Sequence, residues 1–280
     1  LLSVTAIAKR NAAVAALVES TMAREELIAA LTGLGDMERL IGRIVYGTAG
    51  GRDMVSLRSA IERLPALRAQ LAAFSGGRLA ELAGELDDLT EIGAHIGAAI
   101  CDEPPFSVRE GGFIRDGYHE EVDRLRHIMN GGKGVLAEIE AKEKERTGIR
   151  TLKIGYNKVF GYYIEVSNSY KSMVPETYIR KQTLTTGERY ITQELKELES
   201  KILGAHERLI TLERRLFDEL LESISAQLDR IQRTANAVAQ LDVLTALAQV
   251  AAENNYCRPI VDDGDELTIT EGRHPVVEQM

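Results

Sequence analysis

Residues 195–224 read LKELESKILGAHERLITLERRLFDELLESI, and this stretch gives the strongest indication of the fold. Apolar residues recur in it at alternating steps of three and four, and most of the residues between them are charged or polar. The seam consists of Leu195, Leu198, Ile202, Ala205, Leu209, Leu212, Leu216, Leu220 and Ile224. So narrow an apolar strip predicts a long helix that packs against a single partner helix. At about 1.5 Å per residue, this helix would reach on the order of 45 Å.

A second stripe, in residues 119–147, provides the expected partner helix. Its apolar residues also step by three and four: Val122, Leu125, Met129, Leu136 and Ile139. The run Gly131-Gly132-Lys133-Gly134 lies inside this stripe and predicts an interruption of the helix, because glycine is unfavourable in a helix interior. The run is not a phosphate-binding loop, since Gly134 stands where such a loop needs Ser or Thr.

The residues between the two stripes have the composition of β-strands. Apolar and aromatic residues alternate with polar ones over 151–166, which predicts a first hairpin with a turn near Asn157 and Gly161. A second hairpin is predicted from Tyr178–Leu184 and Glu188–Thr192, which are separated by residues 185–187. The sequence therefore predicts a small β-rich module at the tip of an antiparallel two-helix arm.

The remaining residues complete a mainly α fold class. The first hundred residues have helical periodicity and predict a helical core, and strands are expected at Tyr256–Val261 and Leu267–Ile269. The predicted organisation is a helical core (1–118), an ascending lever helix (119–149), a β-rich clamp (150–191), descending lever helices (192–255) and the start of a truncated further domain (256–280).

The composition excludes several classes of protein. A formal net charge of −9 excludes a uniformly basic nucleic-acid-binding surface, and two cysteines cannot form a disulfide scaffold or a closed zinc site. No apolar run reaches the roughly 18 residues that a membrane span needs. Lys9 and Arg10 interrupt the opening apolar residues, which argues against a secretory signal. Because the sequence begins with Leu1 and not Met, we expect a piece of a longer protein.

The charge distribution gives the first indication of function. Residues 150–190 contain seven Lys or Arg and three Glu, a net charge of +4 that leaves −13 for the rest of the chain. A basic tip on an acidic body is suited to contact with a polyanion. The candidate residues for contact with a phosphate backbone are Lys158, Ser169, Lys171, Arg180, Lys181, Gln182 and Arg189, with Ser167 and Asn168 as further hydrogen-bond donors.

Two other interpretations of the tip remain open. An ordinary solvated hairpin surface would carry the same charges without any ligand. Six of the nine tyrosines lie in this region, which could suggest stacking on unpaired bases. We disfavour stacking, because a sheet this small needs its rings for its own core.

No catalytic or metal-binding signature is complete. The strings that start at His119 and at His206 begin like the H-E-x-x-H motif of zinc proteases, but neither has the second histidine. The sequence contains no evident nucleophile, acid–base pair or metal cluster. We therefore expect no catalytic residue, no metal ligand and no bound cofactor, and we do not expect the chain to be an enzyme by itself.

Several long strings resemble the MutS family of DNA mismatch-repair proteins. The most specific are LKIGYNKVFGYYIEV at 152–166 and YIRKQTL at 178–184, continued by ERYIT at 188–192. Further similar strings are PP at 104–105, REGG at 109–112, RDGY at 115–118 and TEGRHPVVE at 270–278. Gly187 stands where many members have a bulkier turn residue. The resemblance extends over nearly the whole sequence.

The resemblance implies a function and a set of partners. MutS proteins are dimeric, ATP-driven sensors of mismatched duplex DNA, in which paired lever helices hold a clamp that grips the DNA backbone without reading its sequence. The resemblance implies that the mismatch-reading domain precedes Leu1 and that the ATPase follows Met280, so the fragment would lack the ATPase site. ATP and Mg²⁺ are expected for the full-length protein, with double-stranded DNA, a second copy and a MutL-type protein as partners. It also implies a bacterial cytoplasmic protein associated with the nucleoid and no membrane.

An alternative to the clamp is a structural coiled-coil arm that binds protein at its tip. A MutS relative that acts in recombination would have the same arm. The sequence of the tip does not decide between these functions.

Overall fold

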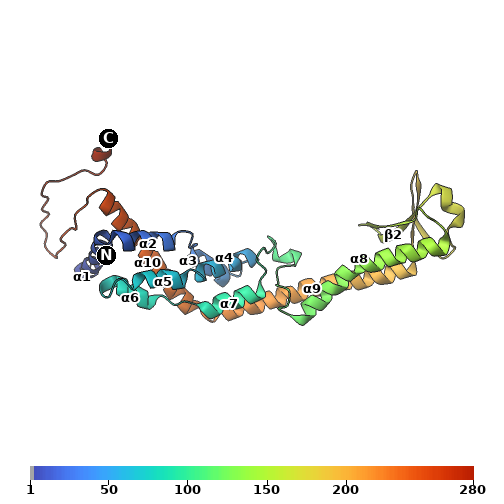
Figure 1. Cartoon of the computed structure of the whole chain (residues 1–280), viewed down its shortest axis with the longest axis horizontal. Coiled ribbons are helices and arrows are strands. Elements are labelled where there is room, and N and C mark those ends of the chain that lie inside the picture. Colours follow the sequence, from blue (N-terminus) through green and yellow to red (C-terminus); the bar gives the residue numbers. More distant parts are fainter. Residues whose placement is uncertain (1–2) are drawn as a thin grey trace. The chain divides into compact units, whose positions relative to one another are not determined.

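The computed structural model describes residues 3–280, apart from the side chains of Val108, Lys133 and Gln279. The chain is mainly helical and contains one four-stranded antiparallel sheet (Figure 1). The predicted fold class, mainly α with a small β module, is thus confirmed at this level. The elements form two compact units: residues up to 41 with 59–89 and 229–280, and residues 42–58 with 90–228.

The first unit is a helical bundle. It contains α1 (Val4–Glu19), α2 (Thr21–Leu31), α5 (Leu64–Leu71), α6 (Gly77–Glu85) and α10 (Leu228–Glu253), while α3 (Met37–Val45) and α4 (Gly51–Ile61) contribute residues to both units. Leu17, Leu27 and Leu67 are among the residues that are fully buried. The helical character predicted for the first hundred residues is confirmed.

Helix α10 is the one helix in the described part of the chain whose length and apolar composition would allow it to cross a membrane. Its polar residues bind other segments of the first unit. Arg230 donates hydrogen bonds to Asp87, Gln240 accepts one from Arg78 at 2.8 Å, and Gln249 accepts one from Arg24 at 2.9 Å. These contacts, together with the buried Leu241, are those of a bundle helix.

The second unit contains α7 (Thr90–Ala99), the short 3₁₀ helix η1 (Val108–Glu110), α8 (Glu120–Thr147), the sheet and α9 (Gln193–Ser225). Helix α8 begins at the cap residue His119 and ends at Gly148, whose φ of 70° gives the left-handed conformation that glycine adopts most easily. Helix α9 begins after Thr192, whose hydroxyl accepts a hydrogen bond from Leu195 N.

Helices α8 and α9 pack antiparallel along their lengths, as a series of contacts shows. Lys142 forms an ion pair with Glu194, Gly132 lies against Ile202, and Arg126 forms an ion pair with Glu213. In these three contacts, the residue number decreases in α8 as it increases in α9, which is the order expected of antiparallel helices. The two predicted stripes therefore pack against each other, but α9 also contacts α7 and η1, so α8 is not its single partner.

The interruption predicted at Gly131–Gly134 is wrong, because α8 continues through these residues. Gly132 is buried at the helix contact, and a Cβ atom there would lie 2.5 Å from Cδ1 of Ile202. The glycine permits close approach of α9. Packing against α9 therefore outweighs the low helix propensity of the glycine run.

A buried carboxylate lies where α8 and α9 meet the loop that follows η1. The Glu213 side chain is 0% exposed and accepts hydrogen bonds from Arg126 and from the backbone N–H of Gly112, both at 2.5 Å. Arg126 is itself only 19% exposed and also donates to the carbonyl of Ile114 at 2.8 Å. Three separate segments thus converge on one carboxylate.

The strands expected at Tyr256–Val261 and Leu267–Ile269 are absent. These residues are irregular and largely exposed, and only a short 3₁₀ helix, η3 (Val277–Gln279), follows them. A strand needs the backbone of a neighbouring strand for its hydrogen bonds, and no strand among the described residues pairs with this segment. Apolar alternation alone did not make it a strand.

Candidate nucleic-acid interface

The sheet consists of two hairpins joined through their second strands. The strands are β1 (Lys153–Asn157), β2 (Gly161–Ser167), β3 (Ile179–Thr183) and β4 (Gly187–Ile191), in the order β1-β2-β4-β3. Both predicted hairpins are confirmed. The sequence did not reveal the pairing of β2 with β4, nor the short 3₁₀ helix η2 (Asn168–Met173) that links the hairpins.

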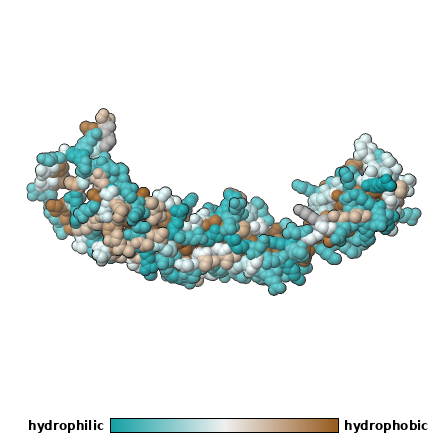
Figure 2. Space-filling model, in the orientation of Figure 1, coloured by the Kyte–Doolittle hydropathy of each residue, from teal (hydrophilic) through white to brown (hydrophobic). Residues whose placement is uncertain are grey.

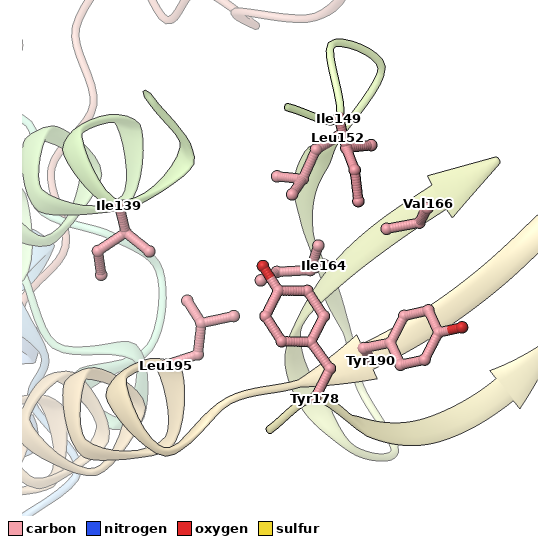
Figure 3. Packing of buried hydrophobic residues seen from close by; sticks show 8 residues of the cluster. All are labelled: Ile139, Ile149, Leu152, Ile164, Val166, Tyr178, Tyr190 and Leu195. Atoms are coloured by element: carbon pink, nitrogen blue, oxygen red, sulfur yellow. The ribbon is translucent and has the colours of Figure 1, made fainter. Parts of the chain in front are cut away.

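One face of the sheet packs against the two helices. Ile164 and Val166 of β2 and Tyr190 of β4 form a cluster with Ile139 of α8 and Leu195 of α9 (Figure 3). Tyr178 belongs to the same cluster, and Tyr162 and Tyr170 pack at its edge. Most tyrosines of this region therefore contribute to the core of the sheet.

The segment before β3 is fixed to α8 by a polar contact. The Tyr178 hydroxyl donates to Oε2 of Glu143 at 2.5 Å, and Arg146 donates to the same carboxylate. Burial opposes ionisation of Glu143, but the hydrogen bonds from Arg146 and Tyr178 hold its pKa below the ordinary value. The carboxylate therefore stays charged and holds the sheet to the end of α8.

A second carboxylate covers the backbone edge of β1. The Glu140 side chain accepts a hydrogen bond from Ile154 N at 2.9 Å and another from Lys144. The backbone bond from Ile154 is the main reason that the pKa of Glu140 is lowered, and Lys144 adds to it. This contact pairs a strand N–H that faces away from β2.

On the helix-facing side of the sheet, the structure brings together Lys171 of η2 and Arg180 of β3. Both donate to Oε1 of Glu188 on β4, with distances of 2.5 Å from Lys171 Nζ and 3.3 Å from Arg180 Nη1. The Tyr190 hydroxyl donates to the other oxygen of Glu188. The bonds from Lys171 and then Tyr190 lower the pKa of Glu188 to about 2, while burial and the bond to Glu188 raise the pKa of Tyr190 to about 12.

On the opposite face, Arg189 is held by three neighbours. Its guanidinium donates to Glu165 at 2.9 Å and to the side-chain oxygen of Gln182 at 3.0 Å. It also lies over the ring of Tyr163, 4.3 Å from the centroid. Gln182 and Arg189, both predicted to contact a phosphate backbone, are thus engaged with each other.

The other predicted residues face solvent. Lys158 lies in the turn between β1 and β2, and Ser169 lies in η2; both are exposed. Lys181 is exposed at the irregularity in the pairing of β3 with β4, between Arg180 and Gln182. Neither Lys158 nor Lys181 forms an ion pair within the described residues. The surface over the sheet seen in Figure 2 is mainly hydrophilic.

Sequence reasoning missed the partners of these cations. In the sequence, Glu188 and Glu165 only lower the net charge of residues 150–190. The structure places both carboxylates in contact with predicted cations. Within residues 3–280, no group of three or more His, Cys, Asp or Glu side chains is placed to hold a metal ion.

Comparison with known proteins assigns the sheet and its helices to one family. Residues 117–208 match the family model of MutS family domain IV. The whole chain is 48% identical to the DNA mismatch repair protein MutS of Symbiobacterium thermophilum, of which it covers 32%. It is also 48% identical to the protein of the same name from Desulforamulus reducens, over 97% of the chain and 31% of that protein. The chain therefore belongs to the MutS family and spans about a third of the length of these relatives.

Proposed function

We propose that the sheet module, residues 150–191, contacts the sugar–phosphate backbone of duplex DNA without reading its base sequence. The observation that carries this proposal is the placement of its cations. Lys158, Lys171, Arg180 and Lys181 all lie on its surface, while the rest of the chain is acidic. Lysine and arginine contacts to phosphates supply affinity and position, and they do not depend on base identity.

The distribution of charge favours contact through the module only. A polyanion is attracted to a region with a net charge of +4 and repelled by a remainder with a net charge of −13. The relatives are named DNA mismatch repair proteins, and we therefore propose that the polyanion is DNA. Because the exposed donors of the module are mainly lysine and arginine cations, we expect contacts to the phosphate backbone and not to base edges.

We further propose that α8 and α9 act as a lever that links the module to the rest of the protein. Their seam continues from the Arg126–Glu213 pair to the Lys142–Glu194 pair, so that the two helices resist independent sliding. Movement at one end would then be passed to the sheet at the other end. A rigid pair of packed helices can carry coupling of this kind.

Further expectations concern the full-length protein. We propose that it is an ATPase that uses ATP and Mg²⁺, that it acts as a dimer of two copies, and that it works with a MutL-type partner in the bacterial cytoplasm. These proposals rest on the family to which the chain belongs. The chain itself would supply the clamp and the lever and no catalytic group.

The proposal is tested by titrating the chain into fluorescently labelled duplexes of two unrelated sequences. Anisotropy is recorded at several salt concentrations between about 25 and 200 mM, a range over which phosphate contacts weaken strongly. We expect equal affinity for both sequences and a linear fall of log K with log salt. Absence of binding at every salt concentration would instead favour the alternative function, a structural arm that binds protein.

A matched pair of lysine variants locates the contact. Lys158→Ala should flatten the salt slope by about one unit and weaken binding to both sequences equally. Lys201→Ala removes the same charge from an exposed position on α9, outside the module, and should leave the slope unchanged. Equal effects of the two variants would show that only net charge matters and would reject the module as the binding surface.

A further inference from the structure

Two of the surface cations share a single acceptor atom. Lys171 comes from η2 and Arg180 from β3, and the side-chain nitrogens of both meet Oε1 of Glu188. The cations are half exposed, with 54% and 61% of their side chains accessible, whereas the Glu188 side chain is only 3% exposed. Both cations can therefore reach a phosphate, while the carboxylate remains beneath them.

Glu188 is fixed in place from its other side. The Tyr190 hydroxyl donates to Oε2, so each carboxylate oxygen has a partner and the side chain cannot easily rotate. Tyr190 is buried in the cluster that joins the sheet to the helices. A phosphate that approaches the two cations must therefore compete with an anion that does not move away.

We propose that Glu188 is a built-in counter-charge that makes Lys171 and Arg180 act toward DNA as one cation instead of two. The group of three side chains has a net charge of +1, and both donors are oriented toward one point. It therefore binds one phosphate and leaves the module with weaker attraction to DNA than its number of cations suggests. This inference rests on the proposed function, since it concerns how the same surface meets the duplex.

The sheet itself provides matched comparisons. Lys158 and Lys181 are exposed and have no anionic partner within the described residues, so each should count as one phosphate contact. Glu165 pairs with Arg189 on the opposite face, but Arg189 is also held by Gln182 and by the ring of Tyr163. Because only 21% of the Arg189 side chain is exposed, it should not reach a phosphate even when Glu165 is neutralised.

The first experiment compares Glu188→Gln with Glu165→Gln in the salt titration described above. Both variants add one positive charge to the net charge of the chain. We expect Glu188→Gln to steepen the salt slope by about one unit and to tighten binding at low salt, because two cations then act separately. Glu165→Gln should leave the slope near that of the unmodified chain. Equal slopes for the two variants would overturn the inference.

A rescue experiment separates a counter-charge from a merely structural residue. Lys171→Ala should flatten the slope by about one unit, because Arg180 is then neutralised by Glu188. Combining Lys171→Ala with Glu188→Gln should restore the slope of the unmodified chain, because Arg180 becomes free. Further weakening in the combined variant, instead of rescue, would show that Glu188 only supports the fold.

A third comparison leaves the buried glutamate unchanged, in case Glu188→Gln impairs folding as judged by far-UV circular dichroism. The double variant Lys171→Ala/Arg180→Ala should flatten the slope by about one unit, and Lys158→Ala/Lys181→Ala by about two. If the two double variants flatten the salt slope by the same amount, the inference is overturned. If the unmodified chain shows no salt-dependent binding at all, the proposed function fails; if it binds and only these contrasts fail, the function stands without the counter-charge.

Discussion

Glu213 and Glu188 are two buried glutamates of the same unit that both bind cations, yet their surroundings differ. Glu213 joins α9 to α8 and to the loop at Gly112, and its partner Arg126 is itself largely buried. Glu188 lies in the sheet, and its partners Lys171 and Arg180 are more than half exposed. The charged donor of the first carboxylate is largely buried, whereas the charged donors of the second are largely exposed.

The difference suggests what each carboxylate does. A buried ion pair is not accessible to a ligand. We therefore infer that Glu213 and Arg126 fix the arrangement of the three segments that meet there. The cations on Glu188 retain donors that can meet an external anion. The exposure of the cations, and not the burial of the carboxylate, distinguishes a structural ion pair from one that can take part in binding.

The largest effect is expected from removing the enclosed carboxylate. Glu213→Ala leaves the guanidinium of Arg126 and the N–H of Gly112 without their acceptor, and should lower the free energy of unfolding of this unit by about 3–5 kcal/mol. Urea denaturation followed by far-UV circular dichroism measures the change. Glu219→Ala removes an exposed glutamate from the same helix and should cost less than about 0.5 kcal/mol. A loss below about 1 kcal/mol for Glu213→Ala would contradict the structural role.

A smaller effect is expected at Gly132, where α8 lies tightly against Ile202 of α9. Gly132→Ala would place a Cβ atom against Ile202, whereas Gly131 and Gly134 have no neighbouring atom within 4 Å of a Cβ position. Gly131→Ala and Gly134→Ala should each stabilise the helix by up to about 1 kcal/mol. Gly132→Ala should be less stable than these two variants by about 1–2 kcal/mol because of overpacking. Thermal and urea unfolding of the three variants tests this order; equal stability would mean that the helices are not in tight contact here.

Acid should act selectively on the carboxylate in the sheet. The pKa of Glu188 is lowered from 4.5 to about 2, so its stabilising contribution is complete above about pH 4.5 and is lost as the pH falls toward 2. The difference in stability between the unmodified chain and Glu188→Gln should therefore shrink over this range. Hydrogen exchange of the sheet amides at a series of pH values measures the difference. A constant difference across the range would show that Glu188 is not stabilised as an anion.

The smallest effect is expected from an exposed ion pair that joins the same two helices. Lys142 and Glu194 are 3.1 Å apart, with 63% and 48% of their side chains exposed. Lys142→Ala should change the free energy of unfolding by no more than about 0.5 kcal/mol, because water screens the pair. Raising the salt concentration should remove this small effect. A cost above about 1 kcal/mol would show that exposure does not decide the value of an ion pair here.

The sequence predicts the repeating parts of this fold well. The seam from Leu195 to Ile224 and the alternation at 151–166 have the periods of a helix and of strands, and the structure has these elements at these places. Each pattern is local and regular, so it can be recognised without knowledge of the rest of the chain.

The features that failed depend on contacts between distant residues. The glycine run in α8 is helical because Gly132 packs against Ile202, seventy residues away. The terminal segment around Leu267 alternates like a strand, but no described strand pairs with it. Local propensity cannot anticipate either outcome.

The candidate site was only half predictable for the same reason. Composition identified the cations, but the acceptor shared by Lys171 and Arg180 depends on the register of β3 with β4. That register shifts at Lys181, which a count along the sequence does not reveal. The position of the predicted cations could be read from the sequence, but their partners could not.

The two edges of the sheet differ in their exposure to other molecules. At the β1 edge, the Glu140 carboxylate accepts a hydrogen bond from Ile154 N. At the β3 edge, every residue of the strand is exposed. An open edge invites a second strand to add to the sheet and leads to aggregation, and charge together with irregular pairing discourages such addition. Arg180 and Lys181 lie on this open edge, where the pairing with β4 is irregular. The positive charges that we assign to DNA contact would thus also keep neighbouring copies of the protein from adhering through their sheets when no DNA is present.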